Sequence, residues 1–243
     1  MNIFSLLYNE VIYKPLLNGL IFLYNVIPGH DLGIAIIVLT IIIRIVLYPL
    51  NQKAIKSQKK MQLIQPKIKE IQQKYKDDKE KQGRAMMDLY KEHKINPASG
   101  CLPILVQLPV LWGLFSVLRA GLNEENFVRL YSFVARPEVI NNMFLGILDL
   151  SQKNIILAVL AGIAQFIQSK MITPQTSSSS GGNDFASAMS KQMVYLFPIF
   201  TIFIAASLPA GLALYWLATT IFGIVQQYFV LNPRTKQLKD QKA

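Results

Sequence analysis

The amino-acid sequence predicts an all-α membrane protein with five transmembrane helices around a hydrophilic groove. Hydrophobic residues make up 52% of the 243 positions and gather in long runs nearly free of charge, a composition that fits lipid rather than water as the solvent. Several runs approach the roughly 20 residues that a helix needs to cross the hydrocarbon core. The alternating segments typical of a closed barrel are not seen in the sequence, so spanning helices are the predicted unit.

Five apolar segments are predicted to span the bilayer: residues 32–50, 102–118, 154–168, 193–208 and 210–231. The third covers only about 22 Å at 1.5 Å per residue, so it needs its neighbours or local thinning of the bilayer to cross. An earlier apolar stretch, residues 16–27, lies between Pro15 and Pro28 and is too short to span. We place this stretch on the membrane interface.

These segments divide the chain into consecutive parts. The parts are an N-terminal interfacial segment (1–31), a first span (32–50), a cytoplasmic helical hairpin (51–96), a second span (97–120), an extracytoplasmic loop (121–153), a third span (154–170), a cytoplasmic loop (171–192), a fourth span (193–208), a fifth span (209–231) and a basic cytoplasmic tail (232–243).

The uneven distribution of basic residues predicts the orientation of the chain. Thirteen of the 25 Lys and Arg residues lie between Lys53 and Lys94, so the positive-inside rule assigns this loop to the cytoplasm before any nucleic-acid patch is considered. With five crossings, nineteen basic residues then face inside and five face outside. We predict a multi-pass protein with its N-terminus outside and its C-terminus in the cytoplasm, and no specific nucleic-acid partner.

The basic inner loop carries a helical pattern of its own. Apolar residues at positions 61, 64, 68, 71 and 75 follow spacings of three and four, which predicts an amphipathic helix. Pro66 should kink this helix or set its start. A polar turn over residues 77–83 precedes a second helical stretch, so the two stretches are predicted to fold back as an antiparallel hairpin.

Arg44 is the one charged residue within the five apolar segments. An isolated Arg at bilayer depth costs about 2.5–3.5 kcal/mol or more. Snorkelling toward the headgroups is one interpretation, because Arg44 lies near the end of its segment. Thr40 and Tyr48, however, lie one turn before and one turn after Arg44 on the same helical face. This arrangement favours a polar stripe that points into the protein.

Other predicted spans carry similar stripes of small and polar residues. Small residues and amides commonly join helices in membranes, and for any single Gln this role is more frequent than ligand binding. Beside an Arg without an acidic neighbour in the spans, the stripes together favour a wet cavity that receives water or an incoming acidic group. The stripe residues are Gln107 in the second segment, Ala158, Gly162, Gln165 and Gln168 in the third, and Trp216, Thr220 and Gln227 in the fifth.

Catalytic and metal-binding constellations are missing from the sequence. His30 and His93 lie on opposite sides of the membrane in the predicted topology, so they cannot share a metal, and Cys101 has no His nearby. The sequence also lacks a glycine-rich phosphate loop. We therefore predict no catalytic residue, no metal, no cofactor and no enzymatic activity.

Four segments are distinctive, and together they cover much of the chain. They are GIAIIVLTIIIRIVLYPL (33–50), MQLIQPKIKEIQQKY (61–75), NPASGCLPILVQLP (96–109) and LPAGLALYW (208–216). In sequence and order these segments resemble the YidC/Oxa/Alb family of membrane protein insertases, over nearly the whole chain. The similarity is to the short bacterial form with five spans.

The resemblance implies a groove that opens to the cytoplasm and to lipid and is closed outside, with an arginine in the first span. Arg44 occupies that position, Trp216 corresponds by motif position, and Gln107 and Gln165 are expected as polar groups of the groove. Thr40, Tyr48 and Thr220 complete the candidate substrate groove. The implied function is to move nascent hydrophobic segments from the cytoplasm into the bilayer without nucleotide hydrolysis.

The basic hairpin suits the first capture of such segments, although a helix that rests on the headgroups is an equal alternative. Expected partners are nascent membrane proteins, membrane lipids, the Sec translocon and, through the basic tail, the ribosome, all in the bacterial cell membrane. A solute transporter or anion channel would also explain Arg44, but the inverted repeats of many transporters are not detected. The candidate capture residues are Met61, Ile64, Ile68, Met86 and Met87.

Overall fold

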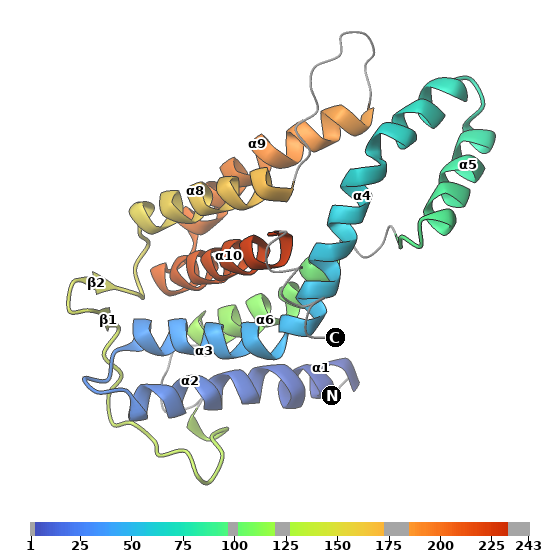
Figure 1. Ribbon diagram of the computed structural model, residues 1–243. Helices are drawn as coiled ribbons and strands as arrows, with labels where there is room; N and C mark the ends of the chain where they lie inside the picture. Colours follow the sequence, from blue (N-terminus) through green and yellow to red (C-terminus); the bar gives the residue numbers. More distant parts are fainter. Residues whose placement is uncertain (1–2, 97–101, 120–126, 173–184, 233–243) are drawn as a thin grey trace.

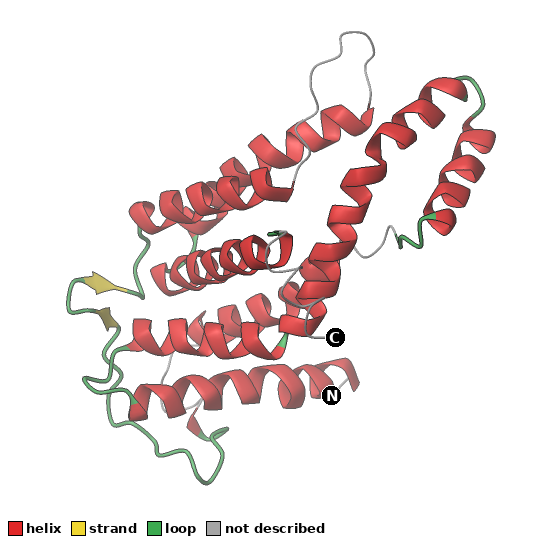
Figure 2. Cartoon of the chain, in the orientation of Figure 1, coloured by secondary structure: helices red, strands yellow, loops and turns green. Residues whose placement is uncertain are grey.

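The computed structural model describes residues 3–96, 102–119, 127–172 and 185–232, and helices dominate that part of the chain (Figures 1 and 2). The predicted all-α class is therefore confirmed. Helix α10 lies between α3 and α8, α9 packs on α8, and α4 and α5 project away from this bundle. The elements are α1 (Ile3–Tyr8), η1 (Asn9–Tyr13), α2 (Lys14–Val26), α3 (Leu32–Val46), α4 (Tyr48–Lys74), α5 (Lys79–Glu92), α6 (Leu102–Arg119), β1 (Met143–Phe144), β2 (Leu148–Asp149), α8 (Ile155–Ile172), α9 (Phe185–Ser207) and α10 (Ala210–Leu231).

The N-terminal segment forms a longer helical rod than the sequence suggested. α1, η1 and α2 follow one another without a break, because the residues that join them keep right-handed helical backbone angles. The rod packs against α3 and α6, and Leu17, Leu20 and Ile21 are completely buried. The apolar stretch at residues 16–27 is thus the second part of a longer helical segment, and its placement on the membrane interface stays a prediction. Pro15 lies inside the rod, directly after the wide π-helical turn of η1.

A sharp bend separates the first predicted span from the cytoplasmic hairpin. α3 ends at Val46, and α4 leaves it at an angle of 67° after the single residue Leu47. Pro49 accounts for the break, since it has no N–H to donate and its ring crowds the carbonyl group four residues earlier. The helix of the first span is thus shorter than residues 32–50. Tyr48 belongs to α4 and does not continue the helical face of Arg44.

α4 and α5 pack against each other around a small hydrophobic core of their own. The first helix begins at Tyr48, so Pro66 lies in its interior and does not set its start. The predicted polar turn is also shorter than residues 77–83, because α5 already begins at Lys79. Asp78 caps α5 by accepting a hydrogen bond of 3.0 Å from the backbone N–H of Lys81, and this bond lowers the pKa of the Asp78 carboxyl.

Two of the remaining helices, α8 and α9, are longer than the predicted spans. α10 has the bounds of the fifth predicted segment, whereas α8 continues to Ile172 and α9 begins at Phe185. By length and composition, α10 is the one unbroken helix of the described residues that could cross a membrane, and the bent pair of α3 and α4 could form a second such unit. α8 and α9 contain shorter apolar stretches. The count of five spans therefore stays a prediction.

The segment between α6 and α8 is fastened to the N-terminal rod by side chains of α2. Buried Asn18 donates a hydrogen bond of 3.2 Å to the carbonyl group of Arg129 and accepts one of 2.6 Å from the N–H of Tyr131. The hydroxyl of Tyr24 accepts a hydrogen bond of 2.9 Å from the N–H of Asn141. These bonds hold the loop over the end of the bundle at which α2 ends and α3 begins.

Candidate functional site

Arg44 lies near the end of α3, and the protein surrounds its guanidinium group only in part. The side chain is half-buried, and its Nε atom has neither solvent contact nor a hydrogen-bond partner within the described residues. Tyr215 of α10 is close enough to interact with it electrostatically. A buried N–H group without a partner is costly, so this position suits water or an incoming acceptor.

Tyr215 joins two further helices at this point. The amide of Gln107 on α6 donates a hydrogen bond to the Tyr215 hydroxyl, and the Tyr215 side chain is almost completely buried. Arg44, Gln107 and Tyr215 therefore form one polar cluster from three helices. Sequence reasoning named Arg44 and Gln107 but missed Tyr215. The available signal was a phenol within an apolar segment, where its hydroxyl requires a partner.

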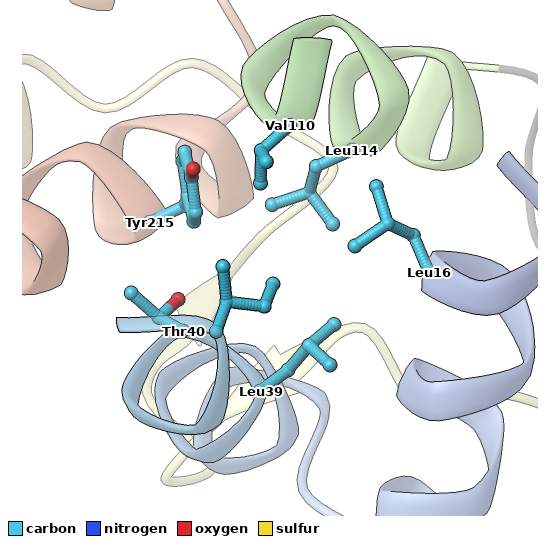
Figure 3. Close-up of a pocket in the computed structure, with 7 residues that line it drawn as sticks. Leu16, Leu39, Thr40, Val110, Leu114 and Tyr215 are labelled. Atoms are coloured by element: carbon cyan, nitrogen blue, oxygen red, sulfur yellow. The ribbon is translucent and has the colours of Figure 1, made fainter. Parts of the chain in front are cut away.

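A small cavity lies beside this cluster, between α2, α3, α6 and α10 (Figure 3). The space is too narrow to hold a water molecule, and most of its lining is aliphatic. The hydroxyl of Thr40 donates a hydrogen bond of 2.6 Å to the Ile36 carbonyl group of its own helix. The geometry therefore does not support a water-facing role for Thr40. The lining residues are Leu16, Leu39, Thr40, Ile43, Val110, Leu114 and Tyr215.

The other predicted groove residues lie at different places. Thr220 is buried and donates a hydrogen bond of 2.8 Å to the carbonyl group of Trp216, whose side chain is half-buried. Gln165 contacts Gln168 on the same helix, at 3.5 Å between the amide nitrogen and oxygen. The structure thus brings Gln107 to Tyr215, which in turn interacts with Arg44, whereas the hydroxyl of Thr220 is satisfied within its own helix.

A second polar contact holds the bend between α3 and α4. The buried Gln226 of α10 donates a hydrogen bond of 3.2 Å to the backbone carbonyl group of Tyr48. Asn51, one turn further along α4, is also buried. Sequence reasoning named the neighbouring Gln227 and missed Gln226, because a contact between residues this far apart in the chain leaves no local pattern.

The hairpin buries part of the predicted capture face. Ile64 and Ile68 lie in its own core with Leu89 and Ile95, and Met61 and Met86 pack against that core. Met87, by contrast, is 50% exposed, and Leu63, which sequence reasoning did not name, is 70% exposed. An apolar substrate could therefore reach Leu63 and Met87 directly but could reach Ile64 and Ile68 only if the hairpin opened.

Comparison with known proteins finds a family model and several similar proteins for this sequence. Residues 22–238 match the family model described as 60Kd inner membrane protein. The chain is 40% identical over 223 residues to "Membrane protein insertase YidC" of Fusobacterium nucleatum, a match that covers 91% of this chain and 97% of that protein. It is 36% identical over 219 residues to the protein of the same name from Geobacter sulfurreducens, covering 89% of this chain and 36% of that protein.

A solved structure shows the same arrangement of helices. The crystal structure is described as an active YidC insertase with the first transmembrane domain resolved, and it superposes on this chain with a TM-score of 0.61 at 31% sequence identity. The match covers 91% of this chain and 46% of that one. The chain therefore spans nearly the full length of some relatives and less than half the length of others.

Proposed function

This chain belongs to the 60Kd inner membrane protein family, which includes proteins named YidC insertase, and we propose that it inserts nascent hydrophobic segments into the bilayer. The observation that carries this proposal is the cluster of Arg44, Tyr215 and Gln107, in which a buried guanidinium N–H has no partner within the described residues. Family membership gives the alternative of a transporter no comparable support.

The proposed mechanism begins with the cost of moving a polar tail through about 30 Å of hydrocarbon. A groove that hydrates the inner part of this path shortens the dry distance, so no nucleotide needs to be hydrolysed. Arg44 attracts acidic groups of the outgoing tail, and the membrane potential adds to the pull on negative charge. The apolar helix then moves sideways into lipid, driven by about 25 cal/mol per Å² of buried apolar surface.

The capture step is assigned to the exposed apolar side chains of the hairpin. Leu63 on α4 and Met87 on α5 are the exposed members, and the flexible thioether of Met87 adapts to different apolar surfaces. Met61, Ile64, Ile68 and Met86 act beneath them as the packing that keeps α4 and α5 together. In this proposal the hairpin presents a small apolar surface on a strongly basic element.

The proposed setting is the bacterial cell membrane, with the N-terminus and the loop before α8 outside and the hairpin and C-terminus in the cytoplasm. The excess of basic residues in the hairpin supports this orientation. An impermeant thiol reagent tests it: a Cys placed at Lys76 should be protected in intact cells, and its labelling from outside would reverse the topology. The Sec translocon and the ribosome are proposed partners, the ribosome through the basic tail, which lies outside the described residues.

Photo-crosslinking to a stalled nascent chain tests the proposed function. A photoreactive phenylalanine at Trp216, the half-buried neighbour of Tyr215 in the sequence, replaces one aromatic side chain with another. The matched control is Ile156 on α8, which is 67% exposed. We expect a crosslink from position 216 to the apolar segment of the nascent chain and much less from position 156. Equal yields at both positions, or none at 216, would contradict a substrate path along α10.

A further inference from the structure

The β1–β2 hairpin presents two exposed apolar side chains at its tip. Phe144 pairs with Leu148, so three residues form the turn. Leu145 and Gly146 adopt positive φ angles of 53° and 69° there. The side chains of Leu145 and Ile147 are 60% and 84% exposed. A turn that exposes large aliphatic side chains on both sides of its glycine is unusual in water, where such positions are commonly polar.

The tip is held rigidly against the beginning of α3. Asp31 caps α3 by accepting a hydrogen bond of 2.9 Å from Ile34 N–H, and its second carboxylate oxygen accepts one of 2.6 Å from the N–H of Leu145. The Phe144 ring packs on Gly33 so closely that a Cβ atom there would lie 2.2 Å from the ring. Leu145 and Ile147 therefore cannot fold back to bury themselves without breaking these contacts.

The hairpin lies close to the point where the exposed apolar surface of α8 begins. The N–H of Gly211, at the start of α10, donates a hydrogen bond of 3.0 Å to the carbonyl group of Leu150, directly after β2. α8 begins at Ile155, only a few residues further along, and its first two side chains, Ile155 and Ile156, are 61% and 67% exposed. Figure 1 shows the hairpin beside the ends of α3 and α10 at which these helices begin.

We propose that the hairpin tip dips into the boundary between headgroups and acyl chains of the adjacent leaflet and anchors this end of the bundle there. Residues 143–148 carry no charge, and Asp149 and Lys153 follow at the edge of the apolar tip, as in segments that lie at a membrane interface. The exposed apolar side chains of the tip and of the beginning of α8 lie at the same end of the bundle. This shared position favours lipid over a protein partner. This proposal requires only that the protein lies in a membrane, so its test does not depend on the insertase activity.

Nitroxide accessibility in a bilayer without other proteins tests the proposal. Cys101 is the only Cys of the chain, so a Cys101→Ser background permits single labels at Ile147→Cys, at Ile156→Cys as the lipid control and at Gln152→Cys as the water control. All three positions are exposed, so substitution there removes little packing. The full chain is reconstituted in vesicles of phosphatidylethanolamine and phosphatidylglycerol, and collision rates with oxygen and with a water-soluble nickel chelate are compared.

We expect the label at position 147 to resemble the one at 156, with oxygen collisions exceeding nickel collisions several-fold. A label at 147 that behaves like the one at 152 would overturn the proposal. Protection of position 147 in native membranes but not in the vesicles would also overturn it, because a protein partner would then cover the tip. A second readout places the label at Leu145→Cys, with and without the additional substitution Ile147→Glu. The nickel collision rate of this label should rise when Glu replaces Ile147, and an unchanged rate would count against anchoring.

Discussion

Substitution of Gly162 by alanine should destabilise the pair formed by α8 and α9. A Cβ atom at this position would lie 2.2 Å from Cγ1 of Ile202, 2.7 Å from its Cδ1 and 3.2 Å from the carbonyl oxygen of Pro198. Ile202 would have to withdraw by roughly 1 Å, and the Pro198 carbonyl is backbone that cannot rotate away. Overpacking of this kind costs about 1–3 kcal/mol, which is roughly a 5- to 150-fold shift of the folding equilibrium.

The assay is reversible unfolding of the full-length protein in detergent or bilayers, with Gly83→Ala as the matched control. Gly83 lies in the interior of α5 with no atom within 4 Å of its added Cβ, so this substitution should stabilise the hairpin by about 0.5–1 kcal/mol. A Gly162→Ala protein as stable as the wild type, with Gly83→Ala behaving as expected, would refute close packing of α8 on α9. The same packing makes Gly162 a residue that joins α8 to α9, and Ala158, one turn earlier, is completely buried in the main core.

Three further predictions concern the Arg44 cluster, the bend between α3 and α4, and the hairpin. If Arg44 acts through its charge, Arg44→Lys should keep much of the insertion activity, whereas Arg44→Ala should impair insertion most for substrates with acidic tails; equal loss for acidic and neutral tails would show a structural role instead. Gln226→Leu should free the bend at Tyr48 and widen the distribution of spin-label distances between α4 and α10, and an unchanged distribution would show that Pro49 alone sets the bend. Ile68→Ala should destabilise the hairpin by about 2–5 kcal/mol, which faster amide hydrogen exchange in α5 would show. Met87→Ser should lower crosslinking of the hairpin to the nascent chain and leave the amide exchange in α5 unchanged.

Hydrophobic runs predict the existence of these helices well but their ends poorly. The fifth segment matched α10, because an apolar run bounded by Pro209 and by Asn232 leaves little choice. α8 and α9 run beyond their apolar runs, since helical hydrogen bonding continues through polar residues such as Ser169. The N-terminal rod was missed because Pro15 usually starts or breaks a helix, and here the wide turn of η1 gives its ring room.

The candidate site was only half predictable for a related reason. Arg44 is conspicuous in the sequence, since a charged side chain within an apolar segment always needs an explanation. Its neighbours Tyr215 and Gln107 come from helices far away in the chain, so their meeting follows from packing. Burial is likewise a tertiary property. The pattern of the hairpin identified Ile64 and Ile68 as one face but could not show that α5 covers that face.

Depletion of the protein tests the central claim most directly. In cells that lack it, and that express either the wild-type chain or Arg44→Ala, the translocated tail of a short single-span substrate is followed by protease accessibility from outside. The proposed function predicts that depletion leaves an acidic tail protected inside, that the wild-type chain restores its exposure, and that Arg44→Ala does so poorly. Unchanged exposure of the tail in depleted cells would contradict the assignment of this chain as an insertase for such substrates.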